Sequence, residues 1–565
     1  MRLRAFALVG TLALLMIGTV LTSCRSQPLG TAEGGLTIFR KPTFTFILPD
    51  TRPDLNETTN AINVQATPGE IEPVAFGVLP QRQIRNATVQ VSDLKGPDGA
   101  VIPASAVDAR VTQVWKQRAP RGKDFETITV AEALLKDDAL DFLAPKWTNS
   151  NLPSCPPDAA VRTDFARNQA KQVFLIITVP PDAAPGEYTA EIRVGDPAQP
   201  ARVDLTLTVL PFKLREPGYK ICMFYNDNIG AEVPLSLYRA RLAYMRSMGI
   251  NGLRLRASRD TLDQEISEVK AAGFEGPIML IDTASYFGPQ GLRDMEFYVD
   301  TLKGAGYDPY IYGVDEPNVP GIEPRRAHSL NGQIAVFNRI KQVGGLATTA
   351  LSVITDRILM DQYRQVLDFA QYSLHTDPDL GFKSYVRALD ASPGTRRHPL
   401  EGYYFTTAFE NPRRNRLLGG FYLPNSHMQA VSFWTFYSYH QKDVPRIFDD
   451  FALPDGNKKR WMTVFPSREG CIPTLQSEAL REGVDDLRYL NTFLEMAKEK
   501  EQETAPAAVD GLRRQVMGEV ARYRDYGSTK PEDLTASQFT DAQFDQSRKI
   551  IAQAIAKLQA IRPGG

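Results

Sequence analysis

The stretch GYDPYIYGVDEPNVPG, residues 306 to 321, decides how the fold of this chain is interpreted. Aromatic and β-branched residues lead directly into two adjacent carboxylates, Asp315 and Glu316, and Pro317 follows them. Such a run is typical of a buried strand, and a buried charge is costly unless it is paired or used. The surrounding sequence should therefore supply either partners for the two acids or a pocket that they face.

Strand-like and helix-like runs alternate on both sides of this stretch. Together with 309–316, the strand-like runs cover 219–226, 249–256, 277–282, 346–353, 369–376, 402–410 and 430–439. Helical periodicity occupies 234–248, 260–272, 291–304 and 324–343 between them. Eight strands that alternate with helices over about 220 residues indicate a (β/α)8 barrel. The sequence predicts a TIM-type barrel over residues 216–473, with 309–316 as its fourth strand.

The regions before and after the barrel have different patterns. Between residues 36 and 215, short alternating runs such as TFTFILP (43–49) and VDLTLTVL (203–210) are separated by Pro, Gly and Asp. This pattern predicts an antiparallel β-sandwich. Residues 474–565 have helical periodicity. The predicted fold class is therefore multidomain, with a β-sandwich, a barrel and a C-terminal helical region.

The first 24 residues have the layout of an export signal. A basic start is followed by an apolar run, and the segment closes on Leu-Thr-Ser-Cys at Cys24. This layout predicts a signal peptide over residues 1–23, and its ending resembles a bacterial lipobox. The resemblance implies a lipid on Cys24, a tether over 24–35, and an exported protein anchored in the bacterial cell envelope at the outer membrane. Plain secretion and an uncleaved membrane anchor remain as alternatives.

Charge and cysteine content exclude several functions. Lys+Arg number 65 and Asp+Glu 66, a net charge of -1, and no basic stripe indicates nucleic acid as a partner. Besides Cys24, the cysteines are Cys155, Cys222 and Cys471, which show no CxxC spacing. We therefore expect neither a disulfide framework nor a metal site, and no cofactor. A single long-range disulfide is left open.

The acidic pair suggests chemistry on a sugar. In a barrel of this kind the active site lies at the carboxyl ends of the strands, where Asp315 and Glu316 are expected. Neighbouring strand residues point to opposite faces, so both acids can reach one substrate only if the strand bends or ends between them. Paired carboxylates in a barrel mouth suggest glycoside hydrolysis. Alternatively, Asp315 caps a turn and Glu316 pairs with Arg325 or Arg326.

A resemblance to a known family rests on three features. They are the order of sandwich and barrel, the motif YGVDEPN (312–318), and GCIPTLQSEALREGVDDLRYL (470–490). In these features the chain resembles glycoside hydrolase family 123, the retaining β-N-acetylgalactosaminidases. The resemblance implies that Glu316 is the general acid/base and that Asp315 holds the substrate's acetamido group, which acts as the nucleophile. Gln476 and Leu487 depart from the usual Arg and Tyr of the closing motif.

The expected activity is removal of a terminal β-linked N-acetylhexosamine, with N-acetylgalactosamine as the expected sugar, from a glycan or glycolipid. One alternative is a retaining glycosidase in which Glu316 is the acid/base and Glu410 the nucleophile. Glu410 can equally be a loop carboxylate that pairs with Arg413 or Arg414. A second alternative is a surface lipoprotein that binds carbohydrate without hydrolysing it.

Further residues at strand ends are candidates for contact with the sugar. Their aromatic or polar side chains suit stacking on a pyranose or bonding to its hydroxyls. The candidates are Tyr225, Asn226, Tyr312, His375, Glu410 and Trp434. Each can instead be structural, and for Trp434 this means packing between the barrel and its helices. Arg481, Asp485 and Asp486, in contrast, are interpreted as charges that hold the fold.

Overall fold

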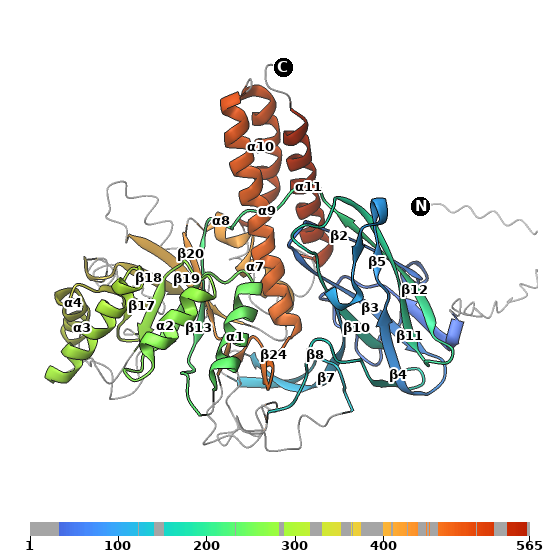
Figure 1. Cartoon of the computed structure of the whole chain (residues 1–565), viewed down its shortest axis with the longest axis horizontal. Helices are drawn as coiled ribbons and strands as arrows, with labels where there is room; N and C mark the ends of the chain where they lie inside the picture. Colours follow the sequence, from blue (N-terminus) through green and yellow to red (C-terminus); the bar gives the residue numbers. More distant parts are fainter. Residues whose placement is uncertain are drawn as a thin grey trace, which may run out of the picture.

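The computed structural model describes residues 33–561 except 122–123, 140–151, 232, 282–287, 317–329, 352–362, 364, 375–398, 408–410, 427, 439–447, 449–450, 452–460, 504–505 and 525–538. Three regions follow one another along the chain: two β-sheets, a closed eight-stranded barrel and a group of helices (Figure 1). None of the helices in the described ranges is both long enough and apolar enough to cross a bilayer.

The N-terminal region contains a five-stranded and a seven-stranded sheet. The first has the order β1 (Leu36–Phe39), β3 (Ile71–Pro80), β10 (Lys171–Thr178), β7 (Val107–Arg121) and β8 (Asp124–Leu135). The second contains β2 (Ala61–Ala66), β12 (Ala201–Val209), β11 (Gly186–Gly195), β4 (Ile84–Val91) and β9 (Thr163–Phe165), with the short strands β5 (Leu94–Lys95) and β6 (Val101–Ile102) beside β11. Residues of both sheets share one hydrophobic core.

One strand pair in this region departs from the predicted antiparallel arrangement. β2 and β12 run parallel, with Leu205 opposite Ile62. The other strand pairs described in these two sheets, such as β11 with β12, are antiparallel. No short hairpin joins β2 to β12, which lie far apart in the sequence, so turn geometry does not fix their relative direction. The alternating pattern of single strands cannot reveal this choice.

The predicted barrel is confirmed. Its strands are β13 (Lys220–Tyr225), β14 (Gly252–Arg256), β15 (Ile278–Ile281), β16 (Tyr310–Tyr312), β17 (Leu346–Leu351), β18 (Phe369–Ser373), β19 (Leu400–Thr406) and β20 (Ala430–Trp434). They close by parallel pairing of β20 with β13. The helices in this part are α1 (Leu235–Ser247), α2 (Leu262–Ala271), α3 (Gly288–Gly304), α4 (Leu330–Gln342), α7 (Pro412–Gly419) and α8 (Tyr422–Asn425).

The interior of the barrel is layered. The end of the barrel at the carboxyl ends of the strands is called the upper end. The lower layer, toward the amino ends of the strands, is apolar and includes Met279, Tyr310 and Phe369. Next to it, a buried polar row crosses the barrel: the Gln371 amide donates to Thr348 Oγ1 at 3.1 Å and accepts from Ser432 Oγ at 2.6 Å. The upper layer consists of Phe224, Ile281, Tyr312, Ala350 and Tyr404, with Trp434 packed against it. The barrel is therefore a filled core, and chemistry is confined to its upper end.

After the barrel, short hairpins and three long helices complete the chain. The hairpins are β21 (Tyr437–Ser438) with β22 (Trp461–Met462), and β23 (Phe465–Ser467) with β24 (Gly470–Ile472). The helices α9 (Leu475–Glu503), α10 (Pro506–Ala521) and α11 (Asp541–Ala560) form the tall group in Figure 1. The predicted C-terminal helical region is thus confirmed. Trp115 of β7 packs edge-on against Phe465, with ring centroids 5.6 Å apart, and so links the first sheet to this part.

A buried charge cluster joins all three regions. Asp486 of α9 accepts from Arg416 of α7 at 2.9 Å and from Arg548 of α11 at 2.9 Å. Arg548 also donates to Glu482 at 2.6 Å and lies 3.4 Å from Glu72 of the first sheet. Asp486 is fully buried. The closing motif of the sequence analysis therefore holds the barrel, the sheets and the C-terminal helices together.

Replacing Asp486 with Ala should destabilise the protein strongly. The change leaves the guanidinium groups of Arg416 and Arg548 buried without their shared carboxylate, which typically costs about 3–5 kcal/mol. Urea unfolding followed by circular dichroism measures this loss. As a control, Glu499→Ala removes an exposed carboxylate that pairs with Arg215 and should cost less than about 1 kcal/mol. Equal losses in the two variants would contradict the role given to the cluster.

The same cluster should make stability fall as pH rises. Burial, opposed by Arg548 and Arg416, raises the pKa of Glu482 to about 8. Burial and then Asp485 raise the pKa of Glu70 to about 6. Both groups hold a proton more tightly in the folded than in the unfolded chain, so their contribution is greatest at low pH and declines up to about pH 8.

Glu482→Gln tests this pH dependence, because glutamine keeps the shape but cannot lose a proton. Melting temperatures measured from about pH 5 to about pH 8 should fall less in this variant than in the parent protein. Glu495→Gln, on the exposed face of α9, should leave the parent's slope unchanged. A parallel slope in parent and Glu482→Gln would show that Glu482 does not titrate in this range.

Candidate functional site

The chain bends at the end of the fourth barrel strand. β16 ends at Tyr312, earlier than the predicted strand 309–316. The chain still bonds to β17 beyond this point, because the amide of Glu316 donates to the Ala350 carbonyl at 3.1 Å. Glu316 has a φ of +43°. A non-glycine residue in this left-handed region costs about 1–2 kcal/mol, and such residues cluster at functional sites.

Glycine is required just before the bend. A Cβ atom at Gly313 would lie 2.4 Å from the Phe337 ring of α4. The missing side chain therefore lets α4 pack closely against the end of β16. The Gly313 amide donates to the Thr348 carbonyl at 2.8 Å, which keeps this segment against β17. The peptide that carries the acidic pair is thus fixed on two sides.

Both acids contact the upper layer of the barrel interior. The Tyr312 hydroxyl donates to Asp315 Oδ1 at 2.6 Å, and the Tyr404 hydroxyl donates to Glu316 Oε1. Tyr312 and Tyr404 belong to the same interior layer. In a straight strand these neighbouring side chains would point to opposite faces. The bend at Glu316 resolves this difficulty and brings both carboxylates to one end of the barrel.

The tyrosines are anchored, protonated donors. Tyr312 is fully buried, and its hydroxyl accepts from the Ala350 amide at 3.0 Å. Burial raises the pKa of Tyr312 well above its ordinary value, and the charge of Asp315 raises it further. Burial, and then the charge of Glu316, likewise raise the pKa of Tyr404 well above its ordinary value. Each half-buried carboxylate therefore receives a hydrogen bond from a neutral hydroxyl that does not ionise near neutral pH.

A buried arginine, absent from the sequence-based candidates, lies next to this pair. Arg254 of β14 is 5% exposed and donates to Asn226 Oδ1 at 2.5 Å. Its guanidinium carbon lies 4.7, 5.1 and 5.7 Å from the ring centroids of Phe224, Tyr312 and Trp434. The sequence did contain a signal, because Arg254 and Arg256 alternate with leucines in GLRLR. Side chains at these alternate positions share one face of the strand.

The structure places the other predicted residues in different environments. Asn226 and Trp434 lie at the barrel's upper end, where Asn226 bonds Arg254 and Trp434 packs edge-on against Phe224, 5.6 Å between centroids. Tyr312 supports Asp315 and, being fully buried, has no surface to offer a sugar. His375, Glu410 and Cys24 lie outside the described residues.

The prediction that Tyr225 contacts the sugar is wrong. Its ring is 1% exposed and packs against Tyr238 of α1, 5.6 Å between centroids, and against Phe436. Phe224, the preceding residue, belongs to the interior layer. Because side chains alternate along a strand, Tyr225 points outward to the helices. The end of the strand was identified correctly, but the face was not.

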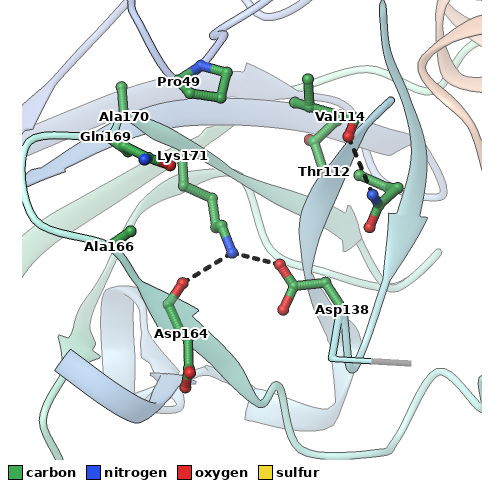
Figure 2. A pocket seen from close by; sticks show the side chains of 10 residues that line it. Pro49, Thr112, Val114, Asp138, Asp164, Ala166, Gln169, Ala170 and Lys171 are labelled. Atoms are coloured by element: carbon green, nitrogen blue, oxygen red, sulfur yellow. Dashed lines mark hydrogen bonds and ion pairs between the residues drawn. The ribbon is translucent and has the colours of Figure 1, made fainter. Parts of the chain in front are cut away.

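Two cavities lie away from the acidic pair. One, of about 210 Å³, lies on the first sheet, where Lys171 bridges Asp138 and the Asp164 carbonyl (Figure 2). The second, of about 340 Å³, lies beside the buried charge cluster and is lined by residues such as Arg40 and Arg548. Neither is lined by a residue of the barrel's upper layer. Within the described ranges, no group of three His, Cys, Asp or Glu side chains could hold a metal ion.

Comparisons with known proteins agree with this fold. No protein-family model and no curated protein matches the chain. A solved family 123 glycoside hydrolase from Clostridium perfringens, studied for glycolipid glycan hydrolysis, aligns with a TM-score of 0.61 and 14% identity over 93% of this chain and 98% of that one.

Two further solved structures align more loosely. A Parabacteroides merdae β-glucuronidase has a TM-score of 0.33 and 11% identity over 73% of this chain and 50% of its own. A Thermotoga petrophila endo-β-1,4-mannanase has a TM-score of 0.32 and 10% identity over 48% of this chain and 77% of its own. The likeness to the clostridial enzyme confirms the predicted resemblance to glycoside hydrolase family 123 at the level of the fold.

Proposed function

We propose that the protein is a glycoside hydrolase that removes a terminal β-linked N-acetylhexosamine, with N-acetylgalactosamine as the expected sugar. One observation carries the proposal: two adjacent carboxylates, Asp315 and Glu316, both contact the upper interior layer of a barrel. A barrel of this type performs its chemistry at that end. The fold shared with a family 123 glycoside hydrolase and a complete acidic pair support catalysis over simple binding.

In the first step, the acetamido oxygen of the substrate attacks the anomeric carbon. The bond to the leaving oxygen breaks, and Glu316 gives its proton to that oxygen. The attacking group belongs to the substrate, so its effective concentration is large and no enzyme nucleophile is needed. Asp315 accepts a hydrogen bond from the acetamido N–H and stabilises the positive charge that develops there.

In the second step, water attacks the anomeric carbon and opens the oxazolinium ring. Glu316, now ionised, takes a proton from that water and is restored to its acid form. Two inversions at one carbon give a product with retained configuration. The Tyr404 and Tyr312 hydroxyls hold the two carboxylates throughout, and Trp434 offers an aromatic side chain at the same end.

A panel of nitrophenyl β-glycosides with and without the 2-acetamido group tests this proposal. We expect hydrolysis of the N-acetylhexosaminides alone, and Glu410→Ala should keep their rates within a few-fold. Hydrolysis of plain galactosides, abolished in Glu410→Ala, would instead establish Glu410 as a protein nucleophile. Sugar binding without turnover would favour a capture protein.

A further inference from the structure

The larger of the two cavities lies where the β-sheets meet the helices. Its volume is about 340 Å³, and its walls come from β2, β3, β12, α7, α9 and α11. Small-molecule sites typically have volumes of about 300–1,000 Å³, so this one suits a single sugar or a molecule of similar size. Two of its lining residues, Asp545 and Lys549, are exposed on α11. A ligand can therefore enter from solvent.

Arg40 brings a positive charge to this cavity. It directly follows β1, and its amide donates to the Glu57 carbonyl at 2.8 Å, which fixes the backbone. Its guanidinium donates to the neutral Asn63 carbonyl at 3.1 Å, and among the described residues it forms no ion pair. Burial lowers the pKa of Arg40, although the charges of Asp545 and Glu72 oppose this effect. A cation in this position is stabilised by an anionic partner.

The other charges of the cavity do not neutralise Arg40. The cations that line it are Arg40, Arg416, Arg548 and Lys549, and the carboxyl groups are Glu72, Glu482 and Asp545. Arg416 and Arg548 are balanced by Asp486, to which both donate, and by Asp545, which lies 2.9 Å from Arg416. Burial raises the pKa of Glu482 to about 8 and that of Glu72 well above its ordinary value, so both tend to stay protonated near pH 7. The charges of Arg40 and Lys549 remain in excess.

Neutral polar side chains of the second sheet line the same cavity. Asn63 and Gln65 lie on the exposed face of β2, where they alternate with buried residues. Thr208 of β12 lies opposite Gln65 in the parallel pair of these strands. Side-chain amides and hydroxyls can both donate and accept hydrogen bonds, as the hydroxyls of a sugar require. The cavity thus combines a cationic side with groups suited to a polyol.

We propose that this cavity binds a monosaccharide that carries an anionic group. The Arg40 guanidinium pairs with the anion, because its planar fork matches both carboxylate and phosphate oxygens. Asn63, Gln65 and Thr208 bond the sugar hydroxyls. The ligand is therefore a uronic acid or a sugar phosphate, which share this chemistry. The cavity lies apart from Asp315 and Glu316, so the proposal does not depend on the proposed function.

Isothermal titration calorimetry of the protein tests this proposal. The acidic probes are glucuronate, galacturonate, glucose 6-phosphate and galactose 6-phosphate, with glucose, galactose and inorganic phosphate as controls. At least one acidic sugar should bind with a Kd of about 1 mM or tighter, and each control should bind at least about tenfold more weakly. The tighter class identifies carboxylate or phosphate as the anion. Binding of no acidic sugar, or equally tight binding of a control, would overturn the proposal.

Substitutions then locate the bound sugar. Arg40→Gln should weaken binding of the acidic sugar by about tenfold or more, because a charge-assisted pair is lost. Lys549→Gln, at an exposed position of α11, should weaken it by only about two- to fivefold. Arg85→Gln, at an exposed position of β4 that does not line the cavity, is the matched control and should keep the parental affinity. Thermal melting verifies that each variant folds. Parental affinity in both Arg40→Gln and Lys549→Gln would place the sugar elsewhere and contradict the assignment.

Discussion

Glu316→Gln should lower kcat on a natural β-N-acetylhexosaminide by about 10²–10⁴-fold, because glutamine cannot protonate the leaving oxygen. Glutamine has the same shape and can still accept the Tyr404 hydrogen bond that Glu316 accepts. The fold and sugar binding should therefore survive, and the loss should appear in kcat rather than in KM. Steady-state kinetics with a natural disaccharide measures it.

The choice of leaving group sharpens this prediction. A dinitrophenyl leaving group departs without protonation, so the first step on such a substrate should be much less impaired in Glu316→Gln than on the disaccharide. Glu495→Gln, on the solvent-exposed face of α9, is the control and should keep parental rates. A parental rate on the disaccharide would remove Glu316 from the role of acid.

Asp315→Asn should lower kcat on N-acetylhexosaminides by about 10²–10³-fold. The charge that stabilises the oxazolinium ion is lost, and removing one such interaction typically costs about 3–4 kcal/mol. Asparagine retains an oxygen that can accept from Tyr312, so the local structure should persist. Kinetics on nitrophenyl N-acetylhexosaminides, with thermal melting to verify folding, provide the measurement.

A comparison of two inhibitors serves as the control for Asp315→Asn. A thiazoline analogue of the oxazolinium ion should bind Asp315→Asn more weakly than the parent by a factor similar to the kcat loss. An inhibitor that mimics only the sugar ring, without the acetamido group, should bind both proteins alike. Equal weakening for both inhibitors would mean that Asp315 holds the ring rather than the acetamido group.

The sequence predicted the eight barrel strands because a parallel strand and its helix each leave a local pattern. The same pattern predicted the order of the elements and the position of Asp315 and Glu316 at the end of the fourth strand. The end of β16 was less predictable. Glu316 adopts a positive φ without being glycine or asparagine, and long-range contacts to β17 and Tyr404 stabilise that conformation.

The face of each strand that points into the barrel was also difficult to predict from the sequence. Tyr225 was chosen because it ends β13, yet Phe224 is the interior residue. Arg254 was not among the predicted site residues, because an arginine within a strand-like run usually indicates an edge strand or a side chain that faces solvent. The inward position of Phe224 and the burial of Arg254 both follow from closure of the barrel, which pairs β13 with β14 and β20. No single strand carries that information.

The most direct test of the central claim uses substrates in which fluorine atoms replace the hydrogens of the acetamido methyl group. Fluorine withdraws electrons from the acetamido oxygen and makes it a poorer nucleophile, while the group's shape changes little. The account predicts that kcat/KM falls progressively through the mono-, di- and trifluoroacetamido substrates. A rate that does not respond to fluorination would show that the acetamido group is not the nucleophile, and would contradict the assignment of Asp315 and Glu316.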